Sequence, residues 1–155
     1  MWETYLGKLL MTFLISMVPV VELRGAIPIA TAHGLDMWSA IAAAIVGNLV
    51  PVPFIIIFIR RIFAFMRRQS SWLDGIVSRL ERRAEKKAEI VHKYEWFGLF
   101  LFVAIPLPGT GAWTGALIAA MLNMRIKRAL PSIALGVMSA GAIVALVTLG
   151  ASSVL

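Results

Sequence analysis

Long apolar segments, separated by short polar or glycine- and proline-rich interruptions, run through the whole chain. The first of them, residues 2–18, is apolar apart from Glu3, Lys8 and small polar side chains. A helix of about 17 residues rises only ~25 Å, which is marginal against a hydrocarbon core ~30 Å thick. We therefore expect the first helix to enter a membrane without crossing it.

Two later segments are long enough to span. Residues 37–66 would form a helix about 45 Å long, kinked at Pro51 and Pro53 because proline removes backbone donors in mid-helix. Residues 131–154 carry no charge and are also long enough to cross a bilayer. Pro131 suits the first turn of that helix, where its missing amide would be unpaired in any case.

Between these spans lie apolar segments that proline and glycine interrupt. Residues 94–105 and 113–122 are half-length helices, joined by Pro106-Leu-Pro-Gly-Thr-Gly-Ala-Trp-Thr-Gly115. A continuous helix cannot run through this stretch, and non-helical backbone at membrane depth survives only when protein or water covers it. The sequence therefore predicts the turn of a re-entrant hairpin. Pro19 to Pro28 interrupt the first apolar segment in the same way, and we expect its turn residues to be Pro19, Gly25 and Pro28, with Pro106 in the second turn.

The segment 67–93 has a different character. Ser71 and Asp74 have capping-box spacing, apolar residues recur at helical intervals, and the opposite face is rich in basic and acidic side chains. This pattern predicts an amphipathic helix that lies on anionic headgroups or packs on a partner. For its second half, a solvated connector is an equal alternative.

The two halves of the chain repeat one order of elements: short helix, broken turn, short helix, loop, spanning helix. Residues 33–47 match residues 122–136 at a constant offset of 89, and Gly25 matches Gly111 at an offset of 86. We expect an all-α polytopic membrane protein, one domain over residues 1–155, with a first repeat over 1–66, the basic helix over 67–93 and a second repeat over 94–155.

Composition supports a membrane protein. The chain has 155 residues, 60% of them hydrophobic and 15% charged, and its mean hydropathy is +0.87. A soluble domain of this size could not hide so much apolar surface. The absence of cysteine excludes disulfides and thiolate chemistry. The N-terminus lacks the basic start of a secretory signal, so we expect it to be retained.

The net charge of +7 is unevenly distributed. Ten of the fifteen basic residues lie between Arg60 and Lys93, and three more lie in the loop around Arg125. Short basic loops mark the cytoplasmic side of a membrane. We therefore expect a multi-pass protein of the cell (inner) membrane with residues 60–93 in the cytoplasm, and no binding of nucleic acid. The two repeats then insert with opposite orientation, an arrangement that places a substrate between facing broken helices.

Glu22 and Arg24 are the strongest candidates for functional residues, because placing a charge inside a membrane costs about 2.5–3.5 kcal/mol on insertion scales. The planar, permanently charged guanidinium of Arg24 suits an anionic headgroup, and Glu22 would then be the site of a coupling proton or sodium ion. A salt bridge between the two that holds the hairpin shut is the alternative.

The second turn, Pro108-Gly109-Thr110-Gly111, offers the backbone amides of its two glycines and its threonine, and glycine-rich turns at helix N-termini attract phosphate. Thr110 and Thr114 could donate hydroxyls to the same ligand. Arg125 and Arg128 are placed to meet a phosphate headgroup at the cytoplasmic side, although simple anchoring is the commoner role of such a cluster. No spacing in the sequence predicts a metal site or a cofactor.

The motifs Glu22-Leu-Arg-Gly-Ala-Ile-Pro28 and Pro106-Leu-Pro-Gly-Thr-Gly-Ala-Trp-Thr-Gly115 resemble those of the small multidrug export proteins, over essentially the whole chain. That group is in turn similar to the DedA/VTT superfamily. The resemblance implies two opposed re-entrant hairpins and the transport or scrambling of lipids, including recycling of undecaprenyl phosphate.

Three functions follow as hypotheses. The first is an ion-coupled flippase of an anionic lipid such as a polyprenyl phosphate, with alternating access between the hairpins. The second is a proton-coupled exporter of cationic amphiphilic drugs, which Arg24 disfavours because it would repel a cation. The third is a scaffold whose amphipathic helix recruits partners. No nucleophile and base are paired in the sequence, so we do not expect an enzyme. One protomer has few spanning helices, and we therefore expect a homodimer among membrane lipids.

Overall fold

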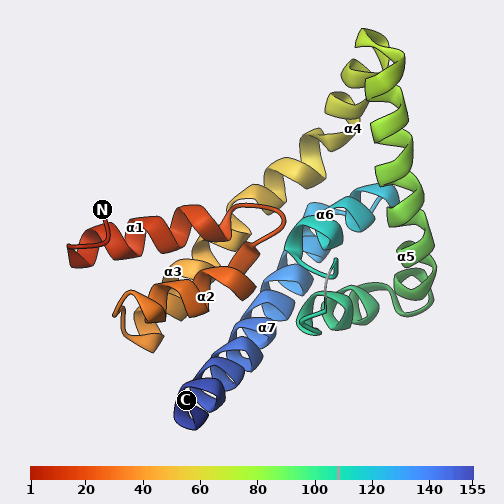
Figure 1. The fold of residues 1–155 in the computed structure, drawn as a ribbon. Helices are drawn as coiled ribbons and strands as arrows, with labels where there is room; N and C mark the ends of the chain where they lie inside the picture. The colour runs from red at the N-terminus through yellow and green to blue at the C-terminus, as the bar shows by residue number, and fades with distance from the viewer. Residues whose placement is uncertain (108) are drawn as a thin grey trace.

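The structure, a computed structural model, describes residues 1–107 and 109–155, apart from the side chains of residues 90, 92 and 93. Over these residues the chain is built from helices joined by short turns (Figure 1). The helices are α1 (Tyr5–Ser16), α2 (Glu22–Ala32), α3 (Met37–Leu49), α4 (Pro51–Gln69), α5 (Ser71–Ala104), α6 (Ala112–Met121) and α7 (Ile126–Val154).

Two helical stretches are long and apolar enough to cross a membrane, as the sequence predicts. The first, Met37–Gln69, has 33 residues and consists of α3 and α4, which meet in a kink at Val50. Pro51 follows directly and lacks the amide that would continue the helical ladder. The second, Ile126–Val154, has 29 residues and is α7. It begins before the predicted start at 131, so Pro131 lies inside the helix and not in its first turn.

The structure joins short helices in pairs at both predicted interruptions, and the first turn is tighter than predicted. α1 and α2 are joined by residues 17–21, and Pro19 lies in this turn. Gly25 and Pro28 lie inside α2, because the helix already starts at Glu22. The second hairpin joins the end of α5 to α6 across residues 105–111, and Pro106 lies there as predicted.

The basic amphipathic helix is the first part of α5. Its N-cap is Ser70, whose hydroxyl accepts from the Leu73 amide at 3.2 Å, one residue before the Ser71 cap expected from sequence. The helix breaks at Glu95, where φ is 46° and ψ is −117°. Figure 1 shows the first part descending from the far end of α4 and the second part turning inward below α6. The break therefore divides a surface helix from a hairpin helix.

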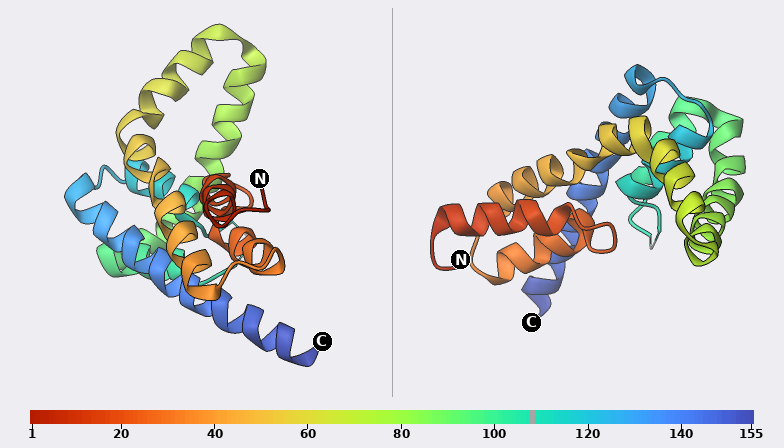
Figure 2. Two further views of the ribbon diagram at one scale, coloured as in Figure 1. Left: turned by 90° about the vertical axis from the view of Figure 1, so that its left-hand side faces the viewer. Right: turned by 90° about the horizontal axis from the view of Figure 1, so that it is seen from above.

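Contacts between helices follow the same plan in both halves. In the first half α1 packs on α2 and on α3, and in the second half α5 packs on α6 and on α7. Helices of the two halves also contact each other: α4 packs on α6, and α7 packs on α2. The view from above in Figure 2 shows α1 to α3 on one side and α5 and α6 on the other, with α7 between them.

The core lies where α2, α5, α6 and α7 meet, and small residues make it tight. Leu23, Val103, Ile118 and Ile133 are fully or almost fully buried there. A side chain on Gly136 would approach Val103 Cβ to 2.7 Å, so α7 contacts α5 closely at this glycine. Small residues at helix contacts are typical of membrane proteins, in which close approach of the backbones replaces hydrophobic association.

The loops before the two spanning helices have the same backbone. Gly34 and Asn123, which are 89 positions apart, are both in the left-handed region, with φ of 77° and 55°. The next residue in each loop, Leu35 and Met124, donates its amide at 3.0 Å to a carbonyl five residues earlier. The sequence match at this offset therefore reflects one shared turn. The match of Gly25 with Gly111 does not, because Gly25 lies within α2 and Gly111 precedes α6.

A candidate functional site between the two hairpins

The break between α5 and α6 is organised by one hydroxyl. Thr110 Oγ1 lies 2.6 Å from the Ile105 carbonyl and 2.7 Å from the Leu107 carbonyl, and it accepts from the Leu107 amide at 3.2 Å. Ile105 is the C-cap of α5, where a helix leaves acceptors without intrahelical partners, and Leu107 lies in the turn that follows. The turn thus presents a cluster of oxygen atoms to its surroundings.

Arg24 of the first hairpin occupies this cluster. Its Nη1 donates to the Leu107 carbonyl at 2.6 Å, and its Nη2 donates to the Ile105 carbonyl at 3.3 Å and to Thr110 Oγ1 at 3.0 Å. A cation at the C-terminal end of a helix is stabilised by the helix dipole as well as by the hydrogen bonds. Arg24 therefore caps α5, although 81 or more positions separate it from these partners.

Glu22 makes the complementary contact at the start of α6. Its side chain is 4% exposed, and its Oε1 accepts from the Trp113 amide at 3.3 Å in the first turn of that helix. The N-terminal end of a helix attracts a negative charge. A side chain on Gly111 would run into the Glu22 carboxylate, so this contact requires glycine at that position. Glu22 itself has φ of 51°, a strained conformation for glutamate.

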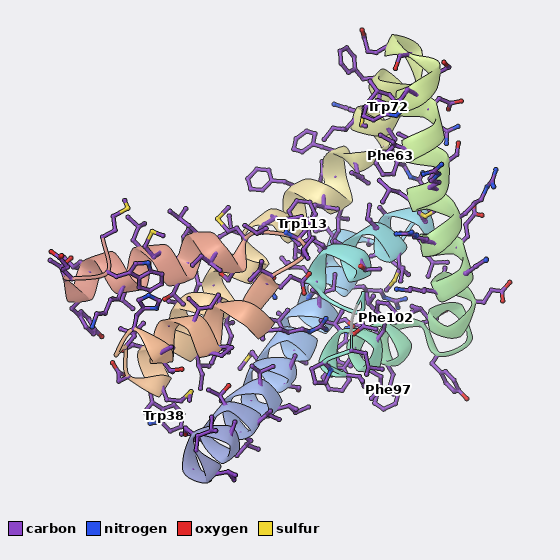
Figure 3. All side chains as sticks on the ribbon, viewed as in Figure 1. Trp38, Phe63, Trp72, Phe97, Phe102 and Trp113 are labelled. Carbon is purple, nitrogen blue, oxygen red and sulfur yellow. The ribbon has the colours of Figure 1, made fainter. Side chains whose placement is uncertain are left out.

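Two further contacts fix the second hairpin against its surroundings. The Trp113 indole donates from Nε1 to the Met17 carbonyl at 3.0 Å, and Figure 3 shows this ring where the first hairpin meets α6. On the other side of the turn, Lys87 Nζ donates to the Gly109 carbonyl at 2.7 Å. The turn is therefore held by cations from both α2 and α5.

Glu22 and Arg24 do not form the salt bridge that was the alternative interpretation. Among the side chains that the structure describes, the ion pairs are those of Arg67 with Asp74 and with Glu81. Each charge of the first hairpin is instead compensated by the helix end of opposite polarity in the second hairpin. This arrangement reduces the penalty for burying both charges.

Two spaces adjoin Arg24. One is a void of about 160 Å³, too narrow for a water-sized sphere, which Arg24 lines together with Glu22, Asn48, Gly111 and Val137. The other is an open groove of about 400 Å³ between Arg24, Pro28, Pro106 and the apolar residues Ile143, Val144 and Val147 of α7. Arg24 therefore borders both a narrow void beside Glu22 and a groove with mostly apolar walls.

A separate pocket of about 510 Å³ lies at the loop between α6 and α7. Arg125 and Arg128 line it together with Asn123 and with Glu95 and Trp96 at the break in α5. It shares no lining residue with the two spaces around Arg24. Within the described residues, no three His, Asp or Glu side chains are grouped so that they could hold a metal ion.

Comparison with known proteins agrees with the motifs at these sites. The model of the family described as "Putative small multi-drug export protein" matches residues 22–143, well over half of the chain. The chain belongs to this family. Searches of curated proteins and of solved structures found no match. The family and the two apolar helices place the protein in a membrane, and the matched region starts at Glu22. The resemblance to the small multidrug export proteins is thus confirmed, while the likeness to the DedA/VTT superfamily stays a prediction.

The structure brings some of the predicted site residues together and separates others. Glu22, Arg24, Thr110 and Gly111 converge at the contact between the hairpins. The Trp113 amide at the start of α6 is bound by the protein's own carboxylate, where we expected a phosphate. The remaining predicted residues lie elsewhere: Gly109 faces Lys87, Thr114 lies in the first turn of α6, and Arg125 and Arg128 line the separate pocket. Pro108 lies outside the described residues.

Three residues of the site were not predicted. Asn48 lies in the apolar helix α3 and lines the void beside Glu22. Trp113 and Lys87 contact the second hairpin turn and its surroundings, and neither was assigned a role in the site from the sequence. A polar amide inside an apolar spanning helix was the signal that could have identified Asn48.

Proposed function

We propose that the protein is an ion-coupled membrane transporter of an anionic amphiphile, with polyprenyl phosphates such as undecaprenyl phosphate as the lipid class. The observation that carries this proposal is the groove of about 400 Å³ that Arg24 lines together with side chains of α7. Its volume is in the range of small-molecule sites. The phosphate headgroup of the lipid would bind at Arg24, and the beginning of the lipid's hydrocarbon chain would lie along Val144 and Val147.

Arg24 suits this role because its present partners are exchangeable. A guanidinium has five N–H donors in a planar fork that matches phosphate geometry. Its partners in the turn are two neutral carbonyls and a hydroxyl, and a charged phosphate is a stronger acceptor than any of them. Binding of the headgroup would therefore loosen the contact between Arg24 and the α5–α6 turn, which is the kind of change that alternating access needs.

The proposal includes the membrane arrangement. α1 has 12 residues and α6 has 10, both too short to cross a bilayer, and the contacts of one half have counterparts in the other. We infer two re-entrant hairpins inserted from opposite sides as an inverted repeat. The basic segment 60–93 would then face the cytoplasm of the cell (inner) membrane, and a homodimer would enclose the path.

The test is flipping of a fluorescent polyprenyl phosphate in proteoliposomes, with a groove-blocking variant. Val147→Trp would fill the groove without touching the contacts of Arg24, since Val147 is 66% exposed. Leu146→Trp is the matched control, because Leu146 is 70% exposed and does not line the groove. We expect flux to fall at least tenfold in Val147→Trp and to persist in Leu146→Trp. Equal flux in both variants would overturn the groove as the lipid path.

The family description favours a second candidate, the proton-coupled export of cationic amphiphiles. A wide apolar groove of about 740 Å³ runs along α4 beside Trp113, with Phe54, Phe58 and Phe65 on its walls. Aromatic faces attract cations, and Glu22 binds the backbone amide of this tryptophan. Export of a cationic dye by the same vesicles, blocked by Phe58→Ala and unaffected by Val147→Trp, would establish this function in place of the first.

A further inference from the structure

Asn48 presents a buried hydrogen-bond acceptor that the protein leaves unused. The residue is 1% exposed. Its Oδ1 is buried and has no hydrogen-bond partner among the described residues. A buried acceptor without a partner is destabilising. Such a group in an apolar helix therefore needs an explanation.

The space in front of Asn48 limits what that partner can be. Asn48, Glu22 and Arg24 line the same void, which is too narrow for a water-sized sphere. A hydrated ion is therefore excluded, and Glu22 and Asn48 provide too few oxygen atoms to replace the hydration shell of a metal cation. A proton on the Glu22 carboxylate needs no additional space. It also supplies what Asn48 lacks, because a protonated carboxyl group has one O–H donor.

The groups that surround Glu22, both charged and neutral, come from several helices. Arg24 lines the void from α2, and the N-terminal end of α6 adds a partial positive charge through the Trp113 amide. α3 contributes the neutral Asn48, while α5 and α7 contribute the apolar Val103 and Val137. Lys87 of α5 lies on the far side of the α5–α6 turn, at the Gly109 carbonyl. Both charges nearest to Glu22 thus favour its ionised form, and a change at Arg24 would alter the balance.

We propose that Glu22 and Asn48 form a proton site, in which the protonated Glu22 carboxyl donates its O–H to Asn48 Oδ1. The role of this proton in transport rests on the proposed function, since it needs an anion bound at Arg24. One proton from water binds to the Glu22 carboxylate, and one returns to water when the site empties. Asn48 is a positioning residue for the protonated state.

Arg24 links this proton site to the substrate groove, because it lines both spaces. A phosphate at Arg24 would neutralise the cation that stabilises ionised Glu22, so the carboxylate would bind a proton more readily. Linkage requires that protonation then favours phosphate binding by the same factor. The proton and the anionic headgroup are therefore transported together.

The matched test compares Asn48→Thr with Asn48→Val, which have the same shape and differ in one oxygen atom. Infrared difference spectra on acidification, recorded on the reconstituted full-length protein without lipid substrate, report the carboxylic-acid band of Glu22. Glu22→Gln identifies that band by removing it. We expect Asn48→Thr to keep the wild-type band and titration midpoint. In Asn48→Val the band should be displaced and the midpoint lowered by about 1 pH unit, the equivalent of one hydrogen bond.

Identical bands and midpoints in Asn48→Thr and Asn48→Val would overturn the proton site, as would a band that persists in Glu22→Gln. If the valine variant does not fold, Asn48→Ser and Asn48→Ala repeat the comparison at smaller size. The pH dependence of polyprenyl-phosphate flux is the second readout, and its midpoint should shift with the infrared midpoint. A wild-type protein that titrates as expected but moves no lipid would contradict the proposed function and leave the proton site in place.

Discussion

In the first hairpin the chain turns beside two charged side chains, Glu22 and Arg24, whereas the break of the second hairpin offers backbone carbonyls, backbone amides and Thr110. The two regions have similar helices and complementary chemistry. Each helix end exposed by the second break receives a charge of the right sign from the first hairpin. A broken helix thus remains stable in an apolar setting because its partner supplies the caps that its own sequence lacks.

The comparison is sharper at equivalent positions. At the offset of 89 that the loops share, Glu22 corresponds to Gly111 and Asn48 to Val137, and all four line one void. Residues at matching positions of the two halves therefore lie together around this void. There the first half carries the polar groups Glu22 and Asn48, and the second half carries glycine and an apolar side chain.

Of the changes considered, Gly111→Ala should have the largest effect, because it disrupts the contact between Gly111 and Glu22. The added methyl group would overlap the Glu22 carboxylate, and overpacking of this kind costs up to about 3 kcal/mol. We expect a loss of most transport and a lower thermal midpoint in detergent. Gly150→Ala is the control, because nothing lies within 4 Å of the position its methyl would take. In a Glu22→Ala background the Gly111→Ala change should cost much less, and additive effects would contradict the contact.

Removing the cation should have the next largest effect. Arg24→Met keeps an unbranched apolar stem and leaves the carbonyls of Ile105 and Leu107 without their charged donor. We expect the free energy of unfolding to fall by about 2 kcal/mol. Chemical denaturation in detergent micelles measures this change. Arg24→Lys should retain part of that stability, because a lysine can still place a charge at the end of α5. A methionine variant as stable as the lysine variant would rule out capping.

Thr110→Val tests the contribution of the second hairpin to the same cluster. The change removes the hydroxyl that contacts Ile105, Leu107 and Arg24, and we expect a cost of about 1 kcal/mol. Thr114→Val, in the first turn of α6, is the matched control and should cost less. Hydrogen exchange of the 105–111 amides should increase in Thr110→Val alone. Unchanged exchange there would show that the hydroxyl does not organise the turn.

Sequence reasoning predicted the elements that depend on local signals. The spans follow from apolar length, the second break from Pro106 and its glycines, and the shared loops from the match between Gly34 and Asn123. The boundary between the basic helix and the following short helix was predicted between residues 93 and 94, and α5 breaks at Glu95. Sequence reasoning failed where distant contacts decide, because the caps made by Arg24 join residues more than 80 positions apart.

The smallest expected effect concerns the N-cap positions of α3 and α7. Asp36 occupies the first and Arg125 the second. Asp36 is the N-cap of α3 and accepts from the Ser39 amide at 2.9 Å, whereas its counterpart Arg125 begins α7 with almost the same backbone and no side-chain cap. The Ser39 amide holds the pKa of the Asp36 carboxyl below its usual value of 3.8. The stability from this cap is therefore complete above the usual value and is lost as the pH falls through the lower folded pKa.

Arg125→Asp should give α7 the cap that α3 already has. An acidic N-cap in place of a basic one is worth about 0.5–1 kcal/mol, so the thermal midpoint at neutral pH should rise. The gain should disappear on acidification below pH ~4, as the new carboxylate is protonated. Arg125→Asn is the control, because asparagine caps without titrating and its gain should persist in acid. A gain in Arg125→Asp that survives acidification would show that loss of the positive charge, and not the new cap, stabilises the start of α7.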